Sequence, residues 1–149
     1  MRAIIEKNMK RIISGVLLVA CLTAGCGGSS PPEPSTYDVP SLVGKDIGGV
    51  KAVLGPPEDD TEKIWPNGDD ENNKEWNKNK KMLLVTFRKN TRKITDFFVG
   101  CDSSSGACGD KQHLLQIGNL KEGDARYRIE FVPAMGHPGE FTGVKAVPN

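Results

Sequence analysis

The chain has 149 residues, of which 37% are hydrophobic, 26% charged and 6% aromatic, a composition that fits one ordinary folded domain. Its four cysteines are too few for a disulfide-dense scaffold. The formal net charge of +1 becomes −2 once residues 1–25, with four basic residues and one acidic residue, are set aside, which argues against a protein that binds nucleic acid by neutralising many phosphates.

The first 25 residues have the pattern of an export signal. Residues 1–11 are cationic, and residues 12–24 (IISGVLLVACLTA) form an uncharged, mostly apolar run that ends in small residues. A membrane-spanning helix needs about 20 apolar residues, and this run has 13. The segment is therefore predicted to be a signal peptide and not a membrane anchor.

Cys26 directly follows the predicted signal, and residues 22–26 (LTAGC) resemble the lipobox of bacterial lipoproteins. The resemblance implies that Cys26 becomes the N-terminus and carries two or more acyl chains, which attach a protein durably to a membrane. Cys21 after LVA is an alternative acylation site, and an ordinary cleaved signal is another. The resemblance also implies that Gly27 directs the protein to the outer membrane, facing the periplasm, if the organism has two membranes.

Residues 26–38 are predicted to be the lipidated cysteine followed by a flexible tether. The stretch GGSSPPEPSTYD is rich in Gly, Ser and Pro and has almost no apolar side chains to offset the entropy of ordering. The single domain is then expected over residues 39–149.

The domain is predicted to begin with a short helix that follows Asp46, a good N-cap, and stops at Gly55 and Pro56. Residues 57–81 are polar, and one or two short strands are expected among them. Residues 82–88 (MLLVTFR) and 93–99 (KITDFFV) predict a hairpin whose alternate apolar residues share one face.

A second short helix and a second hairpin follow. Asp110 is expected to cap a helix that ends near Gly118. Residues 126–132 (RYRIEFV) alternate apolar and charged side chains as a half-buried strand does, and residues 140–147 are its expected partner. The predicted fold class is thus α+β, a small two-layer domain of short helices packed on antiparallel hairpins. Residues 41–99 and 109–148 each have the predicted order helix then hairpin. They are either a diverged internal duplication or two units that are similar only because such units are common in α+β domains.

Several short segments resemble those of small envelope lipoproteins of the SmpA/OmlA type (BamE-like). These are LVGK at residues 42–45, VLGPP at 53–57, a polar loop with two tryptophans, and LVTF at 84–87. The resemblance covers about residues 40–99 and implies a fold similar to the β-lactamase inhibitor protein, with a non-catalytic role in barrel assembly or protein binding. The long stretch 57–81 and the extra C-terminal unit depart from that family. The opening VPSLVGK also resembles a PASTA cell-wall-binding repeat, which is about half as long as this domain.

Cys101 and Cys108 enclose six small or polar residues, and a disulfide between them is the expected state in an exported protein. A redox pair usually has a closer spacing, and a zinc site needs further ligands, of which only His113 lies nearby. A disulfide is therefore predicted, with free or redox-active thiols and a metal pair as the alternatives.

Trp65 and Trp76 stand out in the polar stretch 57–81. Large aromatic side chains in such a stretch are either held in the core or exposed as anchors for a partner. Both residues are candidates for partner contact. The basic run that includes Lys89, Arg92 and Lys93 is a candidate contact for an anionic surface, although charged residues on strands also prevent aggregation.

Motifs that would indicate an enzyme or a cofactor are missing from the sequence. There is no Gly-x-Ser-x-Gly, no His-Glu-x-x-His and no phosphate-binding glycine loop, and counting from Asp69 places lysines where an EF-hand needs glycine and glutamate. The function expected is a lipid-anchored, non-catalytic protein-binding or assembly module of the cell envelope, without a cofactor. Binding of cell-wall polymer or anionic lipid through the basic hairpin is the alternative. An enzyme would need a pocket that joins His113 or His137 to an acid.

Overall fold

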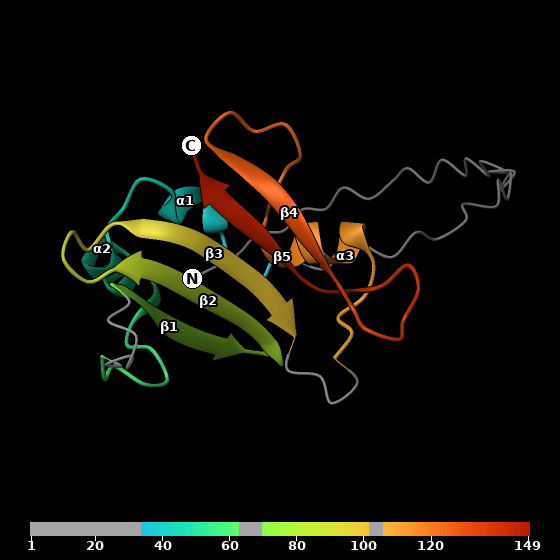
Figure 1. Ribbon diagram of the computed structural model, residues 1–149, viewed down its shortest axis with the longest axis horizontal. Helices are drawn as coiled ribbons and strands as arrows, with labels where there is room; N and C mark the ends of the chain where they lie inside the picture. Colours follow the sequence, from blue (N-terminus) through green and yellow to red (C-terminus); the bar gives the residue numbers. More distant parts are fainter. Residues whose placement is uncertain (1–33, 63–69, 102–105) are drawn as a thin grey trace, which may run out of the picture. The chain divides into compact units, whose positions relative to one another are not determined.

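The computed structural model describes residues 34–62, 70–101 and 106–149, all of which belong to one compact unit (Figure 1). The signal peptide, Cys21, Cys26, most of the predicted tether and Trp65 lie outside the described residues. The elements are α1 (Val39–Leu42), α2 (Ile47–Leu54), β1 (Glu71–Lys78), β2 (Lys81–Arg88), β3 (Ile94–Cys101), α3 (Lys111–Ile117), β4 (Tyr127–Pro133) and β5 (Phe141–Pro148).

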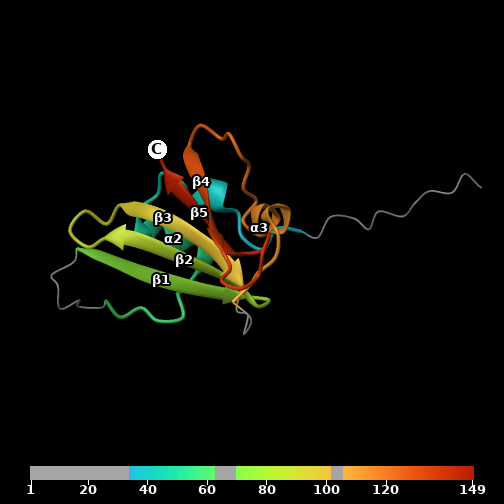
Figure 2. The same ribbon diagram turned by 45° about the vertical axis from the view of Figure 1, so that its right-hand side comes forward.

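The five strands form one antiparallel sheet in the order β1-β2-β3-β5-β4, so that β1 and β4 lie at its two edges (Figure 2). Strands make up 40% and helices 18% of the structure, which is therefore a sheet-dominated fold. The prediction of an α+β domain built of helices packed on hairpins is wrong. The helices span only four to eight residues each, and the two predicted hairpins join through β3 and β5 into a single sheet.

Both predicted helices are present as α2 and α3, and each begins after its predicted N-cap residue. The Asp46 carboxylate accepts a hydrogen bond from the backbone N–H of Gly49 (2.7 Å), and the Asp110 carboxylate accepts one from His113 (2.8 Å). Helix α2 ends at Gly55, whose φ of +83° favours glycine. These caps explain why such short segments are helical.

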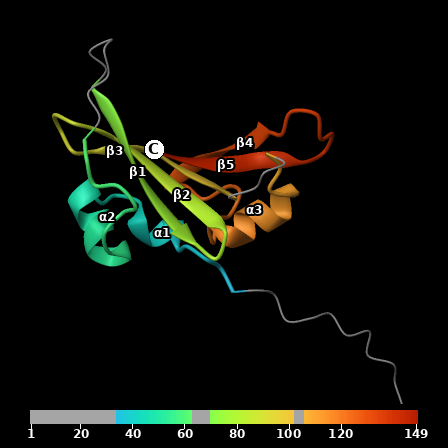
Figure 3. The same ribbon diagram turned by 90° about the horizontal axis from the view of Figure 1, so that it is seen from below.

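The core lies between the three helices and one face of the sheet (Figure 3). The predicted hairpins are confirmed as β2–β3 and β4–β5, and alternate residues of their strands point into the core. The buried side chains at the centre of the core are Ile47, Val50, Leu83, Val85, Phe87, Phe97, Val99, Leu114, Val144 and Ala146. Among the described elements, no helix covers the other face of the sheet.

Strand β1 comes from the polar stretch in which only one or two short strands were expected. Its residues alternate between partly exposed and buried, and the buried ones are Asn72, Lys74 and Trp76. They lie opposite Phe87, Val85 and Leu83 of β2, on the core face of the sheet. Pairing with β2 thus holds a mostly polar segment as a strand.

The packed domain begins before the predicted boundary at residue 39. Tyr37 is buried, and the backbone N–H groups of Thr36 and Tyr37 both donate to the carbonyl of Ile117 in α3. The last residues of the predicted tether are thus part of the fold. In the described ranges no helix is both long and apolar enough to cross a membrane. The proposed duplication of residues 41–99 and 109–148 stays a prediction.

Candidate functional site

A surface groove lies where α2, the segment leading into α1 and the end of β1 meet. Its volume is about 340 Å³. Its walls combine the apolar end of α2 with polar and charged side chains of β1 and the segment that follows α2. The residues that line it are Thr36, Tyr37, Val53, Leu54, Pro56, Glu58, Trp76, Asn77 and Lys78.

Trp76 is at the base of this groove and is only 6% exposed. Its indole N–H donates to the carbonyl of Gly55, 3.1 Å away, at the C-terminal end of α2. The prediction that Trp76 is a candidate for partner contact is therefore wrong. Its ring is held in the core, which was the other alternative. The alternation of β1 directs it inward, and the open end of α2 supplies the acceptor its N–H needs.

Tyr37 joins the groove to the sheet. Its hydroxyl lies 2.7 Å from the carbonyl of Trp76 and 3.0 Å from that of Lys81, so it can donate across the β1–β2 turn. Burial raises the pKa of the Tyr37 phenol to about 12, because the charged phenolate would lose hydration. A tyrosine that the sequence placed in the tether is thus a structural part of the site.

Val53 forms the exposed apolar edge of the groove. It is on the last turn of α2 and is 54% exposed, one of two large hydrophobic residues exposed to this degree among the described residues. Glu58 and Lys78 add one acidic and one basic side chain to the lining. The groove therefore offers an apolar contact with charges of both signs beside it.

The segment after α2 is fastened to β1 by a buried lysine. The Lys74 ammonium, on the core face of β1, donates to the carbonyl of Thr61 at 2.7 Å and lies 3.4 Å from the Asp60 carboxylate. Lys51 of α2 also pairs with Asp60, and these two lysines lower the pKa of that carboxyl. Because the Glu58 N–H donates to the Glu75 carbonyl (2.9 Å), this segment is fixed along β1 and gives the groove a stable wall.

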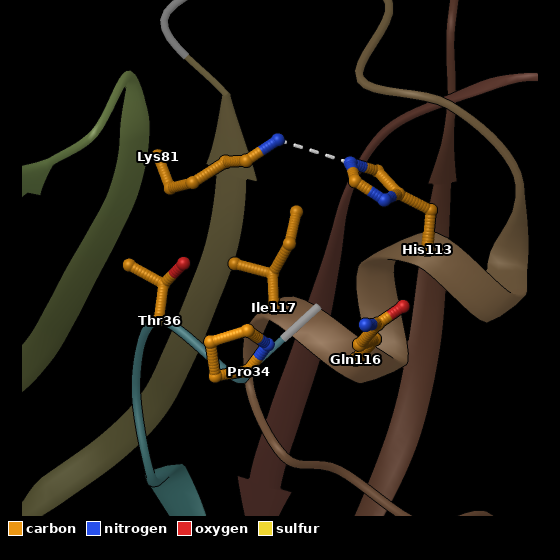
Figure 4. Close-up of a pocket in the computed structure, with 6 residues that line it drawn as sticks. All are labelled: Pro34, Thr36, Lys81, His113, Gln116 and Ile117. Atoms are coloured by element: carbon orange, nitrogen blue, oxygen red, sulfur yellow. Dashed lines mark hydrogen bonds between the residues drawn. The ribbon is translucent and has the colours of Figure 1, made fainter. Parts of the chain in front are cut away.

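Cys101 and Cys108 form the predicted disulfide, with their Cα atoms 5.2 Å apart. Beside it, the Lys81 ammonium lies 3.0 Å from His113 Nε2 (Figure 4). It also lies 3.8 Å from Cys101 Sγ. Since an ammonium can only donate, Nε2 of His113 is the acceptor in this contact. The cavity beneath this pair holds about 10 Å³, room for about one water molecule.

This cluster does not form the metal site that the sequence left as an alternative. The two sulfur atoms and a ring nitrogen of His113 lie within 4.8 Å of one another. Both sulfurs are in the disulfide, however, and metal ions bind cysteine as the thiolate. Among the described residues, none that lines the cavity beside His113 is acidic. His137 is in a separate turn, where its Nδ1 lies 3.8 Å from a carboxylate oxygen of Glu140.

Of the three basic residues in the predicted contact site, Arg92 is paired with an acidic group. Arg92 pairs with the carboxylate of Glu62, whose pKa it lowers, and its guanidinium lies 4.9 Å from the centre of the Phe87 ring. Lys89 is half-buried and Lys93 is exposed. Lys93 forms an isolated backbone bridge with Asp46, the N-cap residue of α2. Arg92 is thus used within the fold, and contact of this turn with an anionic surface stays a prediction.

Comparison with known proteins assigns no family. No family profile matches the chain, and no curated protein is similar to it in sequence. The structure resembles that of a cysteine-rich secretory protein from Staphylococcus aureus subsp. aureus Mu50, with 13% identity and a TM-score of 0.43. The match covers 78% of this chain and 49% of that one, so the chain spans about half the length of that protein. A likeness this distant identifies neither the family nor the activity of the chain.

Proposed function

We propose that the chain is a lipid-anchored protein of the bacterial cell envelope that acts by binding another protein and not by catalysis. The lipobox-like motif at Cys26 supports the anchor, and with Gly27 it favours the periplasmic side of an outer membrane. The groove beside α2 is the observation that carries the binding role, because the exposed Val53 lines it together with the buried, hydrogen-bonded Trp76.

The partner that suits this groove is a short extended segment of another envelope protein with one apolar side chain. Val53, Leu54 and Pro56 provide apolar surface for that side chain. Asn77 lies in the groove lining and on the edge strand β1, two residues beyond Glu75, whose carbonyl already accepts from Glu58. The outer backbone groups of Asn77 itself can bond to an extended peptide. Glu58 and Lys78 add polar contacts that fix the orientation of the segment.

The anchor and the groove work together in this account. A domain tied to a membrane surface by acyl chains explores a thin layer and not the whole periplasm, so its effective concentration toward a membrane-bound partner rises. A groove of this size, with modest apolar area, then needs only weak intrinsic affinity to be occupied.

Site-specific photo-crosslinking in intact cells tests this proposal. A photo-reactive amino acid at Val53 of the full-length chain is expected to give a discrete adduct with another protein. The matched control is Ala52, which is exposed on the same helix but does not line the groove. An adduct from position 53 and not from position 52 supports the proposal; no adduct from position 53, or the same adducts from both, would overturn it.

A further inference from the structure

Strand β4 ends the sheet with backbone groups that face away from β5. Antiparallel strands alternate between residues that bond to the neighbour and residues that point outward. The N–H of Asn149 donates to the carbonyl of Arg126 (3.0 Å), and the register pairs Arg128 with Val147 and Glu130 with Lys145. Residues 126, 128 and 130 thus bond to the β5 side, which leaves the groups of residues 127, 129 and 131 at the outer edge.

These outer groups have almost no partner in the described part of the chain. The N–H of Tyr127 donates weakly to the carbonyl of Asp124 (3.4 Å), and no hydrogen bond to a described residue uses the outer groups of Ile129 or Phe131. At the opposite edge, by contrast, the N–H of Glu58 already bonds to β1. The β4 edge is therefore the more available of the two for pairing with another strand.

The side chains of β4 are complementary to a second copy of the same strand. Arg128 and Glu130 are exposed on one face of the sheet, where they pair with each other at 2.8 Å and would exchange this pair for two between the copies. Tyr127, Ile129 and Phe131 are on the other face. If two copies pair antiparallel about Ile129, then Arg128 of each copy faces Glu130 of the other, and Tyr127 faces Phe131. A strand guarded against pairing would repel its own copy, whereas this one attracts it.

We infer that a second copy of this chain docks on β4, antiparallel and in the register that pairs Ile129 with Ile129. The dimer has two-fold symmetry, and its two sheets join into one continuous sheet. About six backbone hydrogen bonds are available in this register, two at each of the pairs 127–131, 129–129 and 131–127. Two of them replace the weak bonds from Tyr127 to Asp124.

The other registers that keep the outer groups aligned are less favourable. Centring the pair on Arg128 sets Arg128 against its own copy, and centring it on Glu130 sets Glu130 against its own copy, both like-charged contacts. In the first of these Glu130 would face Arg126, which is already paired with Asp124. Centring the pair on Tyr127 sets Arg128 against Arg126 of the other copy and Glu130 against Asp124, both like-charged contacts. Centring it on Phe131 sets Ile129 against Pro133, which has no N–H to donate. The Arg-x-Glu pattern thus selects the register about Ile129.

Cysteine trapping of the full-length chain in cells tests this inference. Facing residues of a hydrogen-bonded antiparallel pair have Cα atoms about 5.5 Å apart, within reach of a disulfide. The variant Ile129→Cys is therefore expected to give a disulfide-linked homodimer on a non-reducing gel after mild oxidation. Arg128→Cys is the matched control, since two copies of residue 128 are offset along the strands and should not link to each other.

A second pair of variants leaves Ile129 unchanged. When chains with Arg128→Cys and chains with Glu130→Cys are produced together, with tags of different length, the mixed dimer should form and the two homodimers should not. Both residues are exposed, so these substitutions leave the core intact.

Charge exchange tests the register itself. In the Ile129→Cys background, R128E sets like charges against each other twice and should lower the trapped dimer at least tenfold. Adding E130R restores opposite charges and should restore the dimer. Equal trapping of I129C and R128C, absence of the mixed dimer, or no response to R128E would each overturn the inference. None of these results depends on the groove beside α2 or on its partner.

Discussion

Gly143 of β5 provides a sharp test of how the sheet is packed. Gly143 is paired with Gly100 of β3, and the ring of Phe98 lies over both glycines on the face that no described helix covers. A Cβ atom added at Gly143 would lie 2.3 Å from Cζ of Phe98 and 2.6 Å from the carbonyl oxygen of Val99. Ordinary contacts of this kind begin at about 3.4 Å, so the ring and the backbone must both move. The two glycines therefore leave the space that the Phe98 ring occupies over β3 and β5.

Gly143→Ala is expected to lower the free energy of unfolding by about 1–3 kcal/mol, the usual cost of overpacking. With a urea dependence of about 2 kcal/mol per molar, the unfolding midpoint falls by about 0.5–1.5 M. Urea unfolding of the detergent-solubilised full chain, followed by tryptophan fluorescence, measures this shift.

A double-mutant cycle separates the ring clash from the backbone clash. In a Phe98→Ala background, Gly143→Ala should cost at least about 0.5 kcal/mol less than in the wild type, because the ring is gone while the Val99 carbonyl remains. An unchanged midpoint for Gly143→Ala, or identical costs in both backgrounds, would refute the packing described for this face.

Three further predictions concern other parts of the fold. Gly48→Ala in α2 should raise the free energy of unfolding by about 0.5–1 kcal/mol in the same urea assay, because its Cβ meets nothing closer than 3.4 Å and alanine favours the helix. Replacing Cys101 and Cys108 together by serine should lower the free energy of unfolding by about 2 kcal/mol, because the disulfide closes a loop across seven positions and so restricts the unfolded chain. A loss below about 0.5 kcal/mol would contradict this chain-entropy explanation. Since the pKa of Tyr37 is raised to about 12 in the folded protein, its stabilising effect is complete below pH 10 and is lost as the pH rises from 10 to 12. A plot of unfolding free energy against pH should show this decline in the wild type and a shallower one in Tyr37→Phe.

The local elements could be predicted because each is specified by residues close together in the sequence. Asp46 and Gly55 mark the two ends of α2, and Asp110 marks the start of α3. The hairpin β2–β3 follows from alternating apolar residues on either side of a short polar turn. Caps and alternation depend on neighbouring residues alone, so a single sequence is enough to read them.

The fold class could not be predicted, because it depends on contacts between distant segments. Strand β1 has Asn72 and Lys74 at two of its three core-facing positions, and nothing in that pattern distinguishes it from a polar loop. Its place in the sheet depends on pairing with β2, and the burial of Lys74 depends on Asp60 and Thr61. Once β1 and the pairing of β3 with β5 are included, the sheet outweighs the helices.

The candidate site was only partly visible in the sequence. Trp76 was singled out as a large aromatic in a polar stretch, and it does lie at the groove, but as its base and not as its exposed contact. Val53 is an ordinary helical residue in the sequence, and only the packing of α2 shows that it faces outward. Tyr37 could have been recognised, because an aromatic residue in an otherwise polar tether is a signal that the chain has begun to pack.

Mass spectrometry of the N-terminal peptide of the mature protein, purified from membranes, tests the central claim most directly. The account predicts a peptide that begins at Cys26 and carries a diacylglyceryl group. A peptide that begins elsewhere with an unmodified Cys26, or one acylated at Cys21, would contradict it.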